Sequence, residues 1–111
     1  MKRPSESRRL IGRIWRGRVS AERLEEYLEY NRVHGLDEIA RRPGCVGVQQ
    51  LSAVRGDIAE VTTITYWESM DAMRAMHGEG LQPSHLDRDA EFLLELPERV
   101  ALVDVHVNDG R

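Results

Sequence analysis

The segment Val61–Met76 constrains the fold most, because it joins a strand directly to a helix. Residues 61–67 are almost entirely β-branched or aromatic, which favours an extended strand that ends at Trp67. Ser69 then offers a side-chain oxygen that can cap a helix N-terminus. Apolar residues follow at helical spacing: Ala72, Met73 and Met76. A strand that hands over to a helix in this way gives a rigid platform for a functional site.

The remaining patterns add three strands and two helices. Alternating apolar residues predict strands over 10–19, 45–54 and 100–107, and a tight turn at Arg55-Gly56-Asp57 leads into the strand 58–67. Helical spacing predicts a helix over 21–40, kinked or broken at His34–Gly35, and a short one from Asp89 through Leu94. The order is β-α-β-β-α-β, with the short helix as a small insert before the last strand. We therefore expect an α+β, ferredoxin-like split βαβ fold with both main helices on one face of an antiparallel sheet.

The chain of 111 residues has the length of one domain. We expect the domain over residues 10–107, a disordered basic tail over 1–9 and a second tail over 108–111. A basic tail is most simply a solvated one, so we expect no nucleic-acid partner. No apolar run reaches membrane-spanning length, and no signal peptide follows the basic residues, so no membrane contact is expected.

The single cysteine, Cys45, excludes a disulfide framework and favours a cytoplasmic location. No His, Asp or Glu residues show the close spacing of a zinc site, so we expect no metal. The face of the sheet turned away from the helices would carry Val46, Val48 and Val103, or the residues that alternate with them. Little of the chain is left to cover that face. We therefore expect a homodimer that packs through its sheet faces.

Five motifs together resemble the antibiotic biosynthesis monooxygenase (ABM) family of dimeric α+β-barrel proteins. The resemblance covers residues 10–107. Its most telling parts are the Trp-Glu-Ser step at Trp67 and the Pro-Gly-x-x-Gly step at Pro43. The motifs are Ile11–Val19, Tyr27-x-x-Tyr30, Arg42–Gly47, Tyr66–Ala72 and Asp89–Glu95.

The resemblance implies a monooxygenase that acts without metal or flavin on a small aromatic or quinol substrate. Trp67 matches the Trp of the family's site, Thr63 stands where the Asn is placed, Met73 stands where the Tyr is placed, and Arg88 lies near the Arg. We expect Trp67 to shape the pocket, and Thr63 and Arg88 to stabilise a substrate oxyanion. Proton transfer would come from Tyr27, Tyr30 or His34. Met73 and Met76 would make the cleft apolar, and His85 would contact the substrate.

Two alternatives remain open. In the first, the protein binds or degrades heme, with His85 as the iron ligand. Met76 then stands where heme-degrading members place a Trp, and Ile14 or Arg13 stands where they place an Asn. In the second, the protein is a non-catalytic dimer that binds a small ligand.

Overall fold

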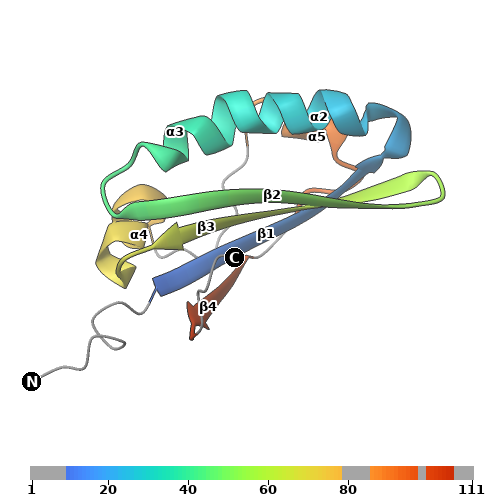
Figure 1. Cartoon of the computed structure of the whole chain (residues 1–111). Coiled ribbons are helices and arrows are strands. Elements are labelled where there is room, and N and C mark those ends of the chain that lie inside the picture. The colour runs from blue at the N-terminus through green and yellow to red at the C-terminus, as the bar shows by residue number, and fades with distance from the viewer. Residues whose placement is uncertain (1–9, 79–85, 98–99, 107–111) are drawn as a thin grey trace, which may run out of the picture.

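A computed structural model describes residues 10–78, 86–97 and 100–106, which form a four-stranded antiparallel sheet with helices on one face (Figure 1). The strands are β1 (Leu10–Ser20), β2 (Cys45–Arg55), β3 (Ile58–Trp67) and β4 (Ala101–Val105). Their order in the sheet is β2-β3-β1-β4, with β1 and β3 in the centre. This is the ferredoxin-like arrangement that the sequence predicts. The two tails expected at the ends of the chain, residues 1–9 and 108–111, lie outside the described residues.

The chain between β1 and β2 forms one continuous helical rod that crosses a face of the sheet. It starts with a 3-10 turn at Ala21–Arg23 and continues as α2 (Leu24–Asn31), a π-helical turn (Arg32–Leu36) and α3 (Asp37–Ala40). The sequence predicts a kink or break at His34–Gly35, and the structure has the π turn there. Because a π turn changes the direction of side chains without ending the helix, the rod stays continuous.

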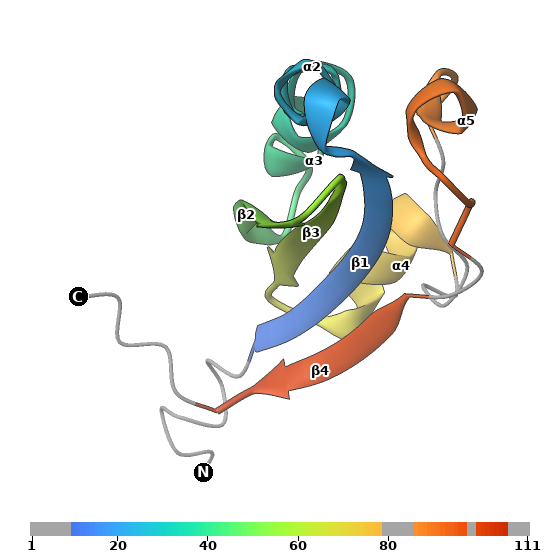
Figure 2. The same ribbon diagram turned by 90° about the vertical axis from the view of Figure 1, so that its right-hand side faces the viewer.

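The second half of the chain supplies two short helices on the same face. Helix α4 (Met70–His77) is capped as predicted, because Ser69 Oγ accepts a hydrogen bond from the Ala72 N–H at 3.1 Å. It ends at Gly78, whose φ of 65° lies in the left-handed region that glycine adopts most readily. Figure 2 shows α2 and α3 over one flank of the curved sheet, with α4 and α5 over the other.

Helix α5 (Asp89–Phe92) is shorter than the sequence predicts. Leu93 is extended and forms a β-bridge with Val19, and the Leu94 N–H donates to the Arg18 carbonyl at 2.9 Å. The chain therefore leaves the helix to pair with β1 before it reaches Leu94.

The helix-bearing face of the sheet, called here the inner face, has two different halves. Toward the end of β1 it is apolar and fully buried. That half consists of Trp15, Val19, Ala59 and Val61, packed under Leu24, Tyr27, Phe92 and Leu93. The centre of the same face carries the buried polar residues Arg13, Thr63 and Thr65. A buried polar group must find a partner or a ligand, so this half locates the candidate site.

On the opposite, outer face, which no described helix covers, an apolar patch lies beside the polar pairs Arg16–Thr62 and Arg18–Glu60. Strand register places Ile14 opposite Ile64 and Gly12 opposite Val103 on this face. Leu51 is 46% exposed and Val103 is 41% exposed. Of the residues expected here, Val48 lies on the inner face instead, because a bulge between Cys45 and Gly47 sets its pairing with Thr65. Within the described residues, no helix is both long and apolar enough to span a bilayer.

Candidate functional site

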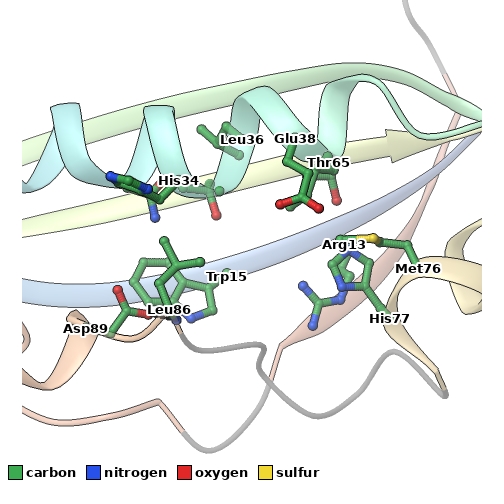
Figure 3. A pocket seen from close by; sticks show the side chains of 14 residues that line it. Arg13, Trp15, His34, Leu36, Glu38, Thr65, Met76, His77, Leu86 and Asp89 are labelled. Carbon is green, nitrogen blue, oxygen red and sulfur yellow. Dashed lines mark hydrogen bonds between the residues drawn. The ribbon is translucent and has the colours of Figure 1, made fainter.

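A cavity of about 110 Å³ lies over the centre of β1 and β3, between the helices of the two flanks (Figure 3). Four side chains form its base, called here the donor floor: Arg13 and Trp15 from β1, and Thr63 and Thr65 from β3. They face one another as two cross-strand pairs, Arg13 with Thr65 and Trp15 with Thr63. Residues that pair in this way have neighbouring side chains on one face, so strand register holds the four groups together.

The helices and the segment before α5 enclose the donor floor. The π turn contributes His34, Gly35 and Leu36, and a Cβ on Gly35 would lie 3.3 Å from Leu86, so glycine permits this close approach. The remaining lining consists of Asn31, Glu38, Ile39, Met76, His77 and Asp89. In Figure 3, Trp15 lies between Asp89 at one end of the cavity and Arg13 and His77 at the other.

Arg13 and His77 place a positive charge beside a neutral imidazole. Burial lowers the pKa of Arg13 to about 10, which still leaves the guanidinium charged at pH 7. Burial, and then the charge of Arg13, lowers the pKa of His77 to about 4. The imidazole is therefore neutral at pH 7. This end of the cavity carries one positive charge and favours a negatively charged ligand group.

The indole N–H groups of the two tryptophans, Trp15 and Trp67, differ in their hydrogen bonding. Trp15 is 5% exposed, and its indole N–H has no hydrogen-bond acceptor among the described residues. The Trp67 N–H donates to Thr65 Oγ1 at 2.9 Å, and its ring meets His77 edge-on with 5.6 Å between the ring centroids. Trp67 therefore lies beside the floor, two residues farther along β3, and orients Thr65, because a hydroxyl that accepts from Trp67 must direct its own proton elsewhere.

The Asp89 end of the cavity is a closed hydrogen-bond network. Asp89 accepts from the Tyr27 hydroxyl at 3.2 Å and from the Leu86 N–H at 2.8 Å. The Asn31 amide donates to the Tyr27 oxygen at 3.3 Å and accepts from Gln50 at 3.2 Å. Burial and the neighbouring Asp89 carboxylate raise the pKa of Tyr27 well above its usual range. Tyr27 therefore keeps its proton and supports the site rather than acting as a base.

Arg88 and Tyr30 line a second, adjoining cavity of about 350 Å³ that shares His34 and Leu86 with the first. The backbone N–H of Arg88 donates to the Tyr30 hydroxyl at 2.8 Å, and the Arg88 guanidinium carbon lies 5.5 Å from the Tyr30 ring centroid. Arg88 also pairs with Glu91 at 2.9 Å. Its charge therefore belongs to the adjoining cavity and not to the donor floor.

The structure brings together only some of the residues expected from the sequence. Three of them line the central cavity: Thr63, His34 and Met76. Tyr30 and Arg88 line the adjoining one. Tyr27, Trp67 and Met73 are fully buried and absent from both linings, and His85 lies outside the described residues.

Sequence reasoning missed Arg13, Trp15, His77 and Asp89 as lining residues. The sequence does contain a pattern that points to Arg13. It alternates with apolar residues on the side of a predicted strand that should be buried, and a charged residue is rarely buried unless it is paired. Of the two candidates on β1, Arg13 faces the cavity, whereas Ile14 faces outward. Among the residues placed by the structure, no cluster of three or more His, Cys, Asp or Glu side chains could hold a metal ion.

Comparison with known proteins identifies the fold. No family model matches the sequence, and no curated protein matches it. A Bacillus cereus protein provisionally named as an antibiotic biosynthesis monooxygenase is similar in structure, with a TM-score of 0.62 and 17% identity over 93% of this chain and 98% of the other. The heme-degrading protein of Mycobacterium tuberculosis, in its heme-free form, gives a TM-score of 0.57 and 19% identity over 93% and 98%.

A mutant of the mycobacterial heme degrader MhuD, solved with two manganese protoporphyrin IX molecules per active site, is also similar. It gives a TM-score of 0.53 and 21% identity over 91% of this chain and 99% of the other. At these identities the likeness establishes the fold, and it is the fold that the sequence motifs imply. Proteins of one fold can differ in function, so the function of this chain has to be inferred from the residues of its cavity and not from these similar structures.

Proposed function

We propose that this protein is a monooxygenase that acts without metal or flavin on a small aromatic or quinol substrate held in the central cavity. The observation that carries the proposal is the buried, charged Arg13 guanidinium beside Thr65 in a cavity with apolar walls. A phenolate or enolate oxygen placed there would be stabilised electrostatically, because a fixed charge in a site shielded from water acts strongly. Such an electron-rich anion is the species that reacts with dioxygen.

For a single-ring quinol, which suits a cavity of about 110 Å³, the reaction balances with dioxygen as the only co-reactant. One oxygen atom of dioxygen replaces a ring hydrogen as a hydroxyl group, the quinol is oxidised to a quinone, and the other oxygen atom leaves as water. Dioxygen is reduced by the electrons that the substrate gives up, so no external reductant is needed.

The proposed roles follow from where each side chain lies. Arg13 and Thr63 hold the substrate oxyanion from the floor, and His34 takes the substrate proton from the roof. Trp67 acts through Thr65, whose hydroxyl it orients. Met76 provides apolar contact, whereas Arg88 and Tyr30 would contact any part of a substrate that extends into the adjoining cavity.

Oxygen uptake with a panel of anthrones and quinols tests this proposal. We expect turnover by the protein without added metal or flavin, and a loss of about 100-fold in kcat for Arg13→Gln, since removing one oxyanion-stabilising group has an effect of that size. Arg74→Gln, an exposed arginine on α4, is the matched control and should turn over as the wild type does. Absence of turnover with every substrate would refute the proposal and favour a non-catalytic ligand-binding protein.

Heme binding is the second candidate, supported by the mycobacterial fold neighbour, which is a heme-degrading protein. The central cavity of about 110 Å³ is well below the roughly 300–1,000 Å³ of pockets that hold drug-sized ligands, and a porphyrin is larger than most of these. The described residues therefore do not fit a porphyrin, and we derive no step through heme. A saturable Soret band on heme titration, lost in His85→Ala, would overturn this conclusion.

We also propose that the protein is a homodimer that packs through its outer sheet faces. The apolar side chains of Ile14, Ile64, Leu51 and Val103 lie on that face, and no described helix covers them. A second copy would cover them with a matching surface, because one two-fold axis places the same patch on both sides of the contact.

A further inference from the structure

The central cavity and the adjoining cavity meet at one place. Two residues line both of them: His34 from the π turn and Leu86 from the segment before α5. In Figure 3 both side chains lie at the end of the central cavity nearest to Asp89, with His34 on the side of the long helical rod and Leu86 on the opposite side. Because the same two side chains line both cavities, they form the wall between them.

Leu86 is the fixed part of this wall. Its backbone N–H donates to the Asp89 carboxylate at 2.8 Å, and its carbonyl accepts from the Asp89 N–H at 3.0 Å. With both backbone groups held, the Leu86 side chain can move only by changing its own rotamer. His34 is exposed and can turn toward solvent, whereas Leu86 is half-buried. A ligand that crosses the wall must therefore displace Leu86.

Gly35 provides the space into which Leu86 packs. A Cβ at residue 35 would lie 3.3 Å from Leu86 Cδ1, which is closer than the roughly 3.5–4.0 Å of an ordinary contact between carbon atoms. Apart from the helix that carries Gly35, the described atoms within 4 Å of that position all belong to Leu86. The absence of a side chain at Gly35 thus lets Leu86 come close to the π turn and narrow the passage between the cavities.

The two cavities differ in the ligand that each can hold. A dry protein cavity of about 150 Å³ is known to hold a benzene molecule, and the central cavity, at about 110 Å³, is of the same order. The adjoining cavity has about 350 Å³. A single ring therefore suits the central cavity, whereas a second, fused ring needs the space on the other side of Leu86.

We infer that Leu86, packed against Gly35, is the residue that limits the substrate to a single ring. Truncation of Leu86 to alanine removes the side chain beyond Cβ and joins the two cavities, so that the site accepts a fused two-ring phenol. The inference deepens the proposed function, on which it rests for the identity of the central cavity as the substrate site. The substrates are single-ring quinols, and Leu86 excludes quinols with fused rings.

Binding measured without turnover tests the inference. We would titrate the protein with phenol and with 2-naphthol by calorimetry at pH 7 in the absence of oxygen. The wild type should bind phenol saturably and 2-naphthol at least about 10-fold more weakly, since even one methylene group too many in a closed pocket has an effect of that size. Equal affinities for the two, or no binding of phenol, would overturn the inference.

Leu86→Ala should bind 2-naphthol at least about 10-fold more tightly than the wild type does, and it should still bind phenol. Leu86→Val shortens the side chain by a methylene group and covers the case in which Leu86→Ala does not fold. It should gain about 3- to 5-fold in affinity for 2-naphthol. Leu94→Ala is the matched control, because Leu94 is 49% exposed and lines neither cavity, and it should bind both ligands as the wild type does. Unchanged 2-naphthol affinity in the Leu86 variants would overturn the inference.

Gly35→Ala tests the contact between the π turn and Leu86. The added methyl group presses on Leu86 and narrows the central cavity, so phenol binding should weaken by about 5-fold. In the Leu86→Ala background the same change meets no leucine side chain, and the loss should be less than about 2-fold, because only residues in contact depart from additivity. An equal loss in both backgrounds would show that Leu86 does not form the wall against Gly35.

Failure of this inference can be told apart from failure of the proposed function. A gain in 2-naphthol binding by Leu86→Ala, without oxygen uptake by any quinol or anthrone, would leave the role of Leu86 standing and refute the monooxygenase. Oxygen uptake by the wild type that is as fast with three-ring anthrones as with single-ring quinols would leave the monooxygenase standing and refute the role of Leu86.

Discussion

The two faces of the sheet reverse the usual distribution of polar and apolar residues. At the centre of the inner face, under the helices, Arg13, Thr63 and Thr65 are buried although they are polar. On the outer face, which no described helix covers, Leu51 and Val103 are exposed although they are apolar. Both faces are built from the same strands, because alternate residues of a strand point to opposite sides. A single residue step along β1 separates Arg13 from Ile14.

The two faces of the sheet suit partners of different kinds. The buried polar cluster lines a cavity of a size that suits a small ligand, and an exposed apolar patch needs a large partner that excludes water. The inner face therefore indicates a ligand, and the outer face indicates a second protein surface. If the chain alone satisfies either face, that face needs no such partner.

The largest effect is expected from a charge at the centre of the outer face. Ile64→Glu would place a carboxylate where it pairs with Ile14 in the proposed dimer contact. Burying an unpaired charge costs several kcal/mol, so we expect association to weaken by at least about 100-fold and the protein to become monomeric. Light scattering coupled to size-exclusion chromatography measures this directly.

Val33→Glu is the control for that experiment, since Val33 is 44% exposed on the π turn, away from the outer face. It should remain dimeric. A wild type that is monomeric at all concentrations, or an Ile64→Glu variant that dimerises normally, would show that the outer face has no large partner of this kind.

A smaller effect is expected from pH at the inner face. His77 has a pKa of about 4 in the folded protein, below its ordinary value of 6.5. Between these values the unfolded chain binds more protons than the folded one, so the free energy of unfolding falls as pH falls from 7 to 4.5. The contribution of His77 to that fall is about 2–3 kcal/mol. His77→Gln should remove this part of the pH dependence.

Urea unfolding at pH 7 and pH 4.5 measures the difference for each protein. His106→Gln, which alters an exposed histidine just after β4, is the matched control and should keep the wild-type difference. If His77→Gln loses as much stability on acidification as the wild type, then His77 is not held neutral by burial and by Arg13, and the electrostatic description of the floor is wrong.

The sequence predicted the elements well because local signals dominate them. The β-branched run of β3 and the cap at Ser69 each depend on neighbouring residues, and both are present. The irregularity predicted at His34–Gly35 is also present, as a π turn in a continuous helix. The cavity was harder to predict, because it depends on pairing between distant residues such as Arg13 with Thr65. The spacing of Thr65 and Trp67 places both on one face of β3, but it does not reveal that the Trp67 N–H is used up by Thr65. The short α5 reflects pairing with β1, which is also a long-range contact.

The smallest effect is expected at Arg88, where sequence reasoning placed a charge that acts on the substrate oxyanion. Its ion pair with Glu91 joins side chains that are 48% and 57% exposed, so Arg88→Gln should change the free energy of unfolding by no more than about 0.5 kcal/mol. Arg88 lines the adjoining cavity, so kcat for oxygen uptake should also stay within about 2-fold of the wild type, whereas Arg13→Gln loses about 100-fold. Oxygen-uptake rates of both variants make the comparison. A loss in Arg88→Gln as large as that in Arg13→Gln would mean that the ligand's charge lies in the adjoining cavity, and the donor floor would then no longer explain why the inner face is polar.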